Sequence, residues 1–234
     1  LLQVFEPGED PDIAAMKREI KGIKEPSSRN LIASVSTKKL RRYKIQNLEQ
    51  SVIIFDLGTK NNITRTLLER NSEVTLVPYL YDAEQVMKLE PDGIIFSNGP
   101  GDPNELKHPI KVAKNLMEKN VTMMGIGLGH CILGLAAGAE AFKLTAEHRG
   151  GRTTVKSDTG SCHITFQNHA YCLKNFQATG FKQSFHDKDD ATNEGLIHES
   201  KPILSVAFNP EGSPGPLDMK EPIFNQFFKF MEEN

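Results

Sequence analysis

The chain has 234 residues, of which 38% are hydrophobic and 25% are charged. This balance is ordinary for a globular protein and excludes a disordered or collagen-like chain. The net charge is −2, so no overall positive field is present to bind nucleic acid or an anionic membrane. No apolar run approaches the ~20 residues that span a bilayer. Three scattered cysteines, Cys131, Cys162 and Cys172, do not make a disulfide framework or a CxxC metal site, which favours a reducing compartment.

Residues 1–50 differ in pattern from the rest of the chain. A short helix is predicted from Ile13 to Ile23, and a basic run follows at Lys38 to Arg42. Charge runs are usually solvated, so we interpret this one as part of a linker. The chain also begins without a basic-then-apolar leader. We therefore predict that residues 1–50 are the tail of a missing N-terminal domain plus a linker, and that residues 51–234 form one domain.

From residue 51 onward, short apolar runs alternate with amphipathic segments. The predicted strands are Val52–Phe55, Val74–Val77, Ile94–Phe96 and Val121–Met124, and the predicted helices lie at Ile63–Leu68, Ala83–Leu89, Val112–Met117 and Cys131–Ala137. Strands that alternate with helices over short connections imply an α/β fold with a doubly wound, mostly parallel sheet. From Thr153 the pattern changes to short strands and turns. The helical spacing of Phe224, Phe227, Phe228 and Phe230 predicts the core face of a closing helix.

Two glycine-rich turns follow predicted strands, Ser97–Pro103 and Gly125–Gly129. Chemistry in such sheets gathers at the carboxyl ends of the strands. The second turn does not match a dinucleotide fingerprint, because the third glycine of that motif would fall at His130. A strand, a sharp turn and a helix are instead typical of an elbow that presents a nucleophile. The middle residue of the elbow usually carries Ser or Cys in a strained conformation, and here it is Gly127.

Five segments in one order carry a resemblance to a known family. They are Ser97–Pro103, Gly125–His130, His148–Gly151, Gln167–His169 and Asn209–Pro216. Together they resemble the class I glutamine amidotransferase domain of carbamoyl-phosphate synthetase, of the small-subunit type, over about residues 29–232. The resemblance implies a flavodoxin-like fold. Two further segments, Asn30–Thr37 and Asn193–Pro202, resemble the fused, eukaryotic-type synthetases.

The resemblance implies a Cys-His-Glu triad that releases ammonia from glutamine. The nucleophile position is Gly127, the histidine position is Asn209, and the glutamate position is matched by Glu211. Glycine supplies no nucleophile, and asparagine cannot take a proton near neutral pH. We therefore predict that the chain does not hydrolyse glutamine.

The resemblance also implies a set of substrate-binding positions. Backbone donors of an oxyanion hole would come from Gly99 and Leu128. A glutamine that contacts the substrate in the family is replaced by Cys131. The other implied positions are Gly101, Asn168, Ala170 and Tyr171. No metal or cofactor is expected in this domain, and ATP and Mg are expected only on a partner synthetase region.

Four residues have competing interpretations. Cys131 lies one helical turn, ~6 Å, beyond the elbow, which is too far for a displaced nucleophile and favours a packed small side chain. His130 and His169 could suggest a metal pair, but no third ligand is evident, so a structural role is favoured. Glu211 without its base would merely cap a turn.

Three functions are carried forward. The first is a pseudo-glutaminase, a docking and allosteric module of a synthetase that makes carbamoyl phosphate from free ammonia, bicarbonate and ATP. The second is a genuine glutaminase with an altered site, and the third is a binding module for another amino acid. The expected partners are a large synthetase subunit or fused synthetase domains and the missing N-terminal domain. The expected compartment is the cytoplasm, or the mitochondrial matrix for an ammonia-dependent eukaryotic synthetase.

Overall fold

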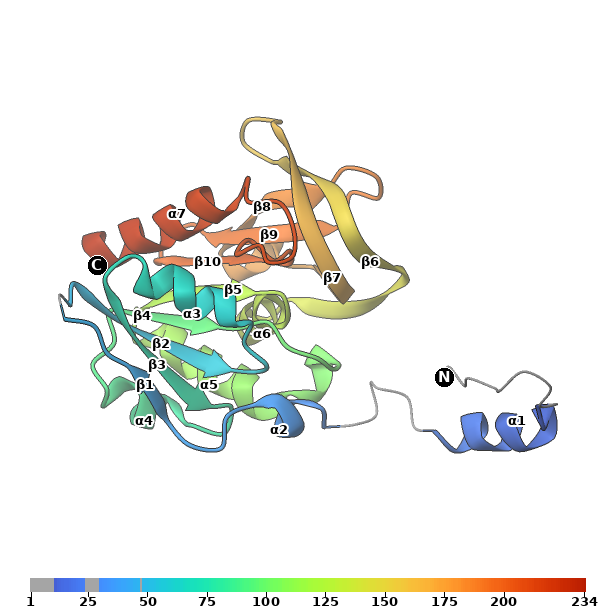
Figure 1. The fold of residues 1–234 in the computed structure, drawn as a ribbon. Helices are drawn as coiled ribbons and strands as arrows, with labels where there is room; N and C mark the ends of the chain where they lie inside the picture. The colour runs from blue at the N-terminus through green and yellow to red at the C-terminus, as the bar shows by residue number, and fades with distance from the viewer. Residues whose placement is uncertain (1–10, 24–29, 47) are drawn as a thin grey trace.

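The computed structural model describes residues 11–23, 30–46 and 48–234, and its strands form one ten-stranded mixed sheet (Figure 1). The strand order is β1-β3-β2-β4-β5-β10-β9-β8-β6-β7. The strands are β1 Arg41–Tyr43, β2 Gln50–Asp56, β3 Ser72–Pro78, β4 Gly93–Phe96, β5 Thr122–Ile126, β6 Glu140–Lys156, β7 Cys162–Lys174, β8 Phe181–Asp187, β9 Asn193–His198 and β10 Ile203–Val206.

The centre of the sheet is parallel, as predicted. Strands β3, β2, β4, β5 and β10 run in the same direction, and their apolar runs are buried on both faces. Such continuous burial explains why these strands read as unbroken hydrophobic runs rather than as alternating ones. All four predicted strands are confirmed as β2, β3, β4 and β5, although Val121 lies one residue before the start of β5.

Helices cover both faces of this parallel region, which confirms the doubly wound α/β fold. One core layer lies between the sheet and α4, α5 and α6, and the other lies between the sheet and α3 and α7. The helices are α3 Asn61–Leu68, α4 Ala83–Met87, α5 Lys107–Glu118, α6 Leu128–Ala137 and α7 Lys220–Glu233. In the closing helix α7, Phe224 and Phe227 are fully buried, whereas Phe228 and Phe230 are half-buried.

The other half of the sheet is antiparallel, and its strands differ from the prediction in length and start. Strand β6 begins at Glu140 rather than near Thr153, and it pairs with β7 along most of its 17 residues. Only Leu144, His148 and Thr154 of β6 are buried, so no apolar run marks where the strand begins. The prediction of short strands was wrong here, because an exposed hairpin needs few buried side chains and so leaves no apolar run in the sequence.

Residues that precede the predicted boundary at residue 50 already pack onto the domain. Ile32, in α2 (Ile32–Val35), belongs to the core, and the Thr37 N–H donates to Asp56 Oδ2 over 2.7 Å. Strand β1 pairs antiparallel with β3 and exposes all three of its side chains. The basic run is therefore solvated, as predicted, but its last residues form a charged edge strand rather than a linker.

The predicted N-terminal helix is confirmed as α1, Ile13–Gly22, which Asp12 caps and which has no buried residue. No helix in the described part of the chain is both long enough and apolar enough to cross a membrane.

Candidate functional site

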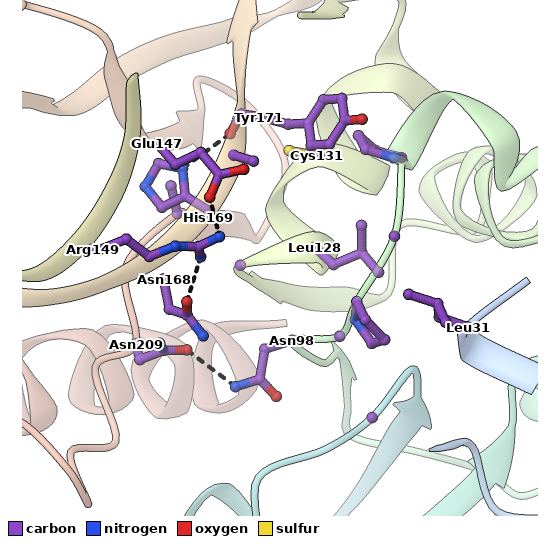
Figure 2. A pocket seen from close by; sticks show the side chains of 18 of the residues that line it. Leu31, Asn98, Leu128, Cys131, Glu147, Arg149, Asn168, His169, Tyr171 and Asn209 are labelled. Atoms are coloured by element: carbon purple, nitrogen blue, oxygen red, sulfur yellow. Dashed lines mark hydrogen bonds and ion pairs between the residues drawn. The ribbon is translucent and has the colours of Figure 1, made fainter. Parts of the chain in front are cut away.

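A pocket of about 540 Å³ opens where β4 and β5 end and faces the middle of β7 (Figure 2). Parallel strands end at a common edge, which is why turns far apart in the sequence meet there. The pocket brings together nine of the ten predicted positions, Gly99, Gly101, Gly127, Leu128, Cys131, Asn168, Ala170, Tyr171 and Asn209. The tenth, Glu211, is fully buried behind this lining.

The turn between β5 and α6 has the geometry of an elbow. Gly127 adopts φ 57° and ψ −110°, a sparsely populated conformation such as the elbow was expected to require. Its N–H donates to the Val206 carbonyl over 2.8 Å, so β10 holds the turn from one side. A Cβ at Gly129 would stand 1.9 Å from the Phe96 carbonyl oxygen, so only glycine lets α6 approach β4 this closely.

The residue at the histidine position is locked into an amide network. Asn98 Nδ2 donates to Asn209 Oδ1 over 3.1 Å (Figure 2). Asn98 Oδ1 accepts from the Lys60 N–H over 3.2 Å. Asn209 is 8% exposed. The side chain can hold a hydrogen bond at this place but cannot remove a proton from a nucleophile.

Glu211 pairs with a residue that the sequence did not single out. Lys60 Nζ lies 2.7 Å from Glu211 Oε1 and also donates to the Gly212 carbonyl over 3.0 Å. Burial raises the pKa of the Glu211 carboxyl, and the Lys60 ammonium opposes that rise. Lys60 lies four residues beyond the end of β2, in a third turn at the carboxyl ends of the strands. That position is the one signal in the sequence that could have identified Lys60 as a site residue. Glu211 is thus an ion-pair partner and not simply a turn cap.

Cys131 and His130, which follow the elbow, are both buried in α6. Cys131 is 4% exposed, and burial raises the pKa of its thiol to about 12. A thiol in that state is a packed small side chain and not a displaced nucleophile, as predicted. His130 Nδ1 lies 2.9 Å from Ser205 Oγ, and burial lowers the pKa of the ring to about 4, so the ring is neutral near pH 7.

A second histidine, His148, forms a buried ionic cluster behind the β7 wall of the pocket. Its Nδ1 lies 3.0 Å from Glu194 Oε1 and its Nε2 lies 2.8 Å from Asp190 Oδ2. Hydrogen bonding to Glu194 raises the pKa of His148, and a carboxylate oxygen at each ring nitrogen favours the imidazolium form. Burial alone would raise the pKa of Glu194, but hydrogen bonds from His148 and His169 lower it below its usual value.

This cluster bears on the metal prediction. The residues that come together are His148, His169 and Glu194, and not His130 with His169. Their potential ligand atoms lie within 4.8 Å of one another. His169 thus has two neighbours that could serve as ligands, which the sequence did not reveal. In the structure, His148 Nδ1 is hydrogen-bonded to Glu194 Oε1, and His169 Nε2 lies 3.3 Å from the same oxygen and 2.8 Å from Gln167 Oε1, so side chains of the protein already contact these ligand atoms.

The outer wall of the pocket is charged. The Arg149 guanidinium donates to the carboxylate of Glu147 and to the side-chain oxygen of Asn168 (Figure 2). Lys143 also lines the pocket. Sequence reasoning named Asn168 but not the three charged residues. Arg149 lies within the His148–Gly151 segment, which was the signal for it.

Replacing Gly127 with cysteine is expected to destabilise the fold by about 1–3 kcal/mol, because an L-residue at positive φ is strained. The new Cβ would also stand 3.2 Å from the Asn98 Cβ, which is a tight contact. Paired thermal melts under reducing conditions measure the effect. Gly151→Cys is the matched control, since its Cβ meets only Ile164 at an ordinary 3.7 Å and its φ is not positive. A Gly127→Cys chain that melted clearly higher would show that residue 127 is not strained.

The parallel sheet, the elbow and the pocket at the strand ends define a class I glutamine amidotransferase fold. The chain belongs to this family, since the model of the family described as glutamine amidotransferase class-I matches residues 53–230. A solved glutamine amidotransferase from Thermotoga maritima has the same fold, with a TM-score of 0.59 at 13% identity over 81% of this chain and 87% of that one.

The chain is also similar to small chains of carbamoyl phosphate synthase and to a related synthase that is much longer. The small chain from Methanopyrus kandleri is 34% identical over 237 residues, which cover 100% of this chain and 64% of that one. The human mitochondrial carbamoyl-phosphate synthase [ammonia] is 40% identical over 212 residues, which cover 89% of this chain and 14% of that one. The chain thus spans less than two thirds of the length of either relative.

Proposed function

We propose that the chain is the glutaminase-type domain of a carbamoyl-phosphate synthetase, that it does not hydrolyse glutamine, and that it serves as a structural and allosteric module. The observation that carries the proposal is the elbow itself. The turn keeps the conformation that presents a nucleophile, yet residue 127 has no side chain to present.

The base position supports the same conclusion. Asn209 is held by Asn98 and cannot take a proton, so the residue at the base position cannot accept a proton from a thiol at residue 127 or return it to the leaving ammonia. The human relative is named for ammonia, and a synthetase that takes free ammonia needs no glutaminase step.

On this proposal the chemistry of carbamoyl phosphate takes place on a partner, either a large synthetase subunit or fused synthetase domains. ATP and Mg belong to that partner. We place the complex in the cytoplasm, or in the mitochondrial matrix if the parent chain resembles the human relative in location as well as in sequence.

The purified chain is expected to release no ammonia from glutamine above background. Removal of triad members in comparable enzymes leaves only a residual rate, because binding and the oxyanion hole still act. A coupled assay for glutamate and ammonia measures it, with a class I amidotransferase that retains its cysteine as the positive control. Turnover near the ~10 s⁻¹ typical of enzymes would contradict the proposal and favour a genuine glutaminase.

The docking role has its own test. Co-expression of the chain with a large synthetase subunit should give a complex that co-purifies, and synthesis of carbamoyl phosphate from ammonia should depend on the presence of the chain. A chain that neither co-purifies nor changes that synthesis would contradict the module role.

A further inference from the structure

Three strands bring potential metal ligands together behind the β7 wall of the pocket. His148 on β6 and His169 on β7 are directly paired across the two strands, and Glu194 comes from β9. Their potential ligand atoms lie within 4.8 Å of one another. His148 and Glu194 are almost completely buried, and His169 alone of the three lines the pocket. The backbone of the sheet therefore holds the cluster in place.

The atoms that surround the ring of His169 are acceptors. Its Nδ1 lies 3.0 Å from the Tyr171 carbonyl oxygen, which can only accept, so this nitrogen carries a hydrogen. Its Nε2 faces two further oxygens, Gln167 Oε1 at 2.8 Å and Glu194 Oε1 at 3.3 Å. The Gln167 amide is fixed in this orientation, because its nitrogen donates to Thr165 Oγ1 over 2.9 Å. A neutral His169 places its Nε2 lone pair against two oxygens, and a positive ion at this point removes the conflict.

His148 converges on the same carboxylate oxygen. Its Nδ1 lies 3.0 Å from Glu194 Oε1, and its Nε2 lies 2.8 Å from Asp190 Oδ2. If protons supplied the positive charge on both rings, two imidazolium groups would lie with centroids 4.9 Å apart and would repel each other. Both would share Glu194 Oε1, while Glu194 Oε2 is buried with no hydrogen-bond partner among the residues that the structure describes. An unsatisfied buried oxygen beside a convergent set of ligands points to a missing cation.

The outer contacts of both imidazoles are those of metal ligands. A histidine that binds a metal almost always donates its other ring N–H to a carboxylate or a backbone carbonyl. His148 has the Asp190 carboxylate at that nitrogen, and His169 has the Tyr171 carbonyl. These contacts turn His148 Nδ1 and His169 Nε2 toward Glu194.

We propose that His148, His169 and Glu194 bind one Zn²⁺ ion, which links β6, β7 and β9 behind the pocket. Two imidazole nitrogens and a carboxylate suit zinc, whereas Mg²⁺ and Ca²⁺ prefer oxygen ligands alone. Glu194 Oε2 or Gln167 Oε1 supplies the fourth ligand. Zinc bonds of about 2.0–2.2 Å place tetrahedral ligands about 3.3–3.6 Å apart. The two ring nitrogens lie 3.0 and 3.3 Å from Glu194 Oε1, so the cluster has to open only slightly.

The ion has a structural role, which departs from the expectation that this domain holds no metal. When zinc binds, it replaces the protons that His148 Nδ1 and His169 Nε2 carry in the metal-free chain. None of its ligands is a triad position, so the inference is independent of whether the chain hydrolyses glutamine.

Isothermal titration with ZnCl₂ tests the site on the 234-residue chain after dialysis against a chelator. We expect one ion per chain with a Kd below about 10 μM, and no binding of MgCl₂ at the same concentrations. With free zinc at about 100 times Kd, the melting temperature should rise by about 5–10 °C. Binding weaker than about 10 μM, or several weakly bound ions per chain, would overturn the proposal.

A histidine variant assigns the ion to this cluster. His169→Gln removes one ligand at a partly buried position and should weaken zinc binding at least about 100-fold. His163→Gln is the matched control, since His163 is also partly buried on β7 but contacts Ser161 near the start of that strand. It should leave the Kd unchanged. Unchanged zinc affinity of the His169→Gln chain would place the ion elsewhere and overturn the assignment.

X-ray absorption at the zinc edge decides the question even if the His169→Gln chain does not fold. The native chain with one equivalent of Zn²⁺ should show two imidazole nitrogens at about 2.0–2.1 Å and carboxylate oxygen at about 2.0–2.2 Å. A zinc shell with fewer than two imidazoles, or with sulfur from a cysteine, would overturn the proposal.

Discussion

A triple variant is expected to show glutaminase activity at least about 10³-fold above that of the Gly127→Cys chain. Its three substitutions are Gly127→Cys, Asn209→His and Cys131→Gln. The single variant supplies a thiol with a pKa near ~8.5 but no base to deprotonate it. The histidine supplies that base, and Glu211 is already placed to orient it, because it lies within 3.5 Å of the Asn98 nitrogen that now holds Asn209. Steady-state release of ammonia is the measurement.

The control for this rescue is the chain with Gly127→Cys and Cys131→Gln but with Asn209 retained. Triad members act as a unit, so this double variant should remain near the single one and the gain should be strongly non-additive. If the double variant matched the triple one, our account of Asn209 as a lost base would be wrong. The structure adds one requirement, since a Cβ at residue 127 lies 3.2 Å from the Asn98 Cβ and that side chain must shift.

Replacing Glu194 with glutamine is expected to lower the free energy of unfolding by about 3–5 kcal/mol, because it leaves the His148 imidazolium without its buried partner. Glu194 and His148 are both almost completely buried and lie 3.0 Å apart. For a chain of this size the change corresponds to a loss of about 6–20 °C in melting temperature. Glu199→Gln is the matched control, since Glu199 is exposed just beyond the end of β9.

The pH dependence of that difference checks the mechanism. The pKa of His148 is raised in the folded state, so its stabilisation is complete below about pH 6.5, its unfolded pKa, and is lost as the pH rises through the folded pKa. The difference in melting temperature between the native chain and the Glu194→Gln variant should therefore be largest on the acidic side of neutrality and should decrease as the pH rises. A gap that is independent of pH, or a loss of less than about 2 °C, would show that the pair does not stabilise the fold in this way.

The sequence alone determined the parallel half of the fold and the positions of the site. Short apolar runs bounded by turns can be satisfied only by strands buried on both faces, so β2, β3, β4 and β5 could be predicted. The glycines around residue 127 mark close backbone approaches, and the positive φ there follows from the turn. The resemblance then assigned Gly99, Leu128, Asn168 and Asn209 to one site, and the structure places all of them in one pocket.

Only the tertiary structure decided which charged groups meet. Lys60 and Glu211 are separated by about 150 residues, and His148 and Glu194 by 46, so no local pattern relates either pair. Their pKa shifts arise from burial and from partners on other strands, which residue type and spacing do not encode. The direction of the Asn209 amide has the same origin. A backbone N–H on one turn orients Asn98 on a second turn, and Asn98 orients Asn209 on a third. A hydrogen bond constrains only the groups that it joins, so this chain of constraints exists only once the sheet has brought the three turns together.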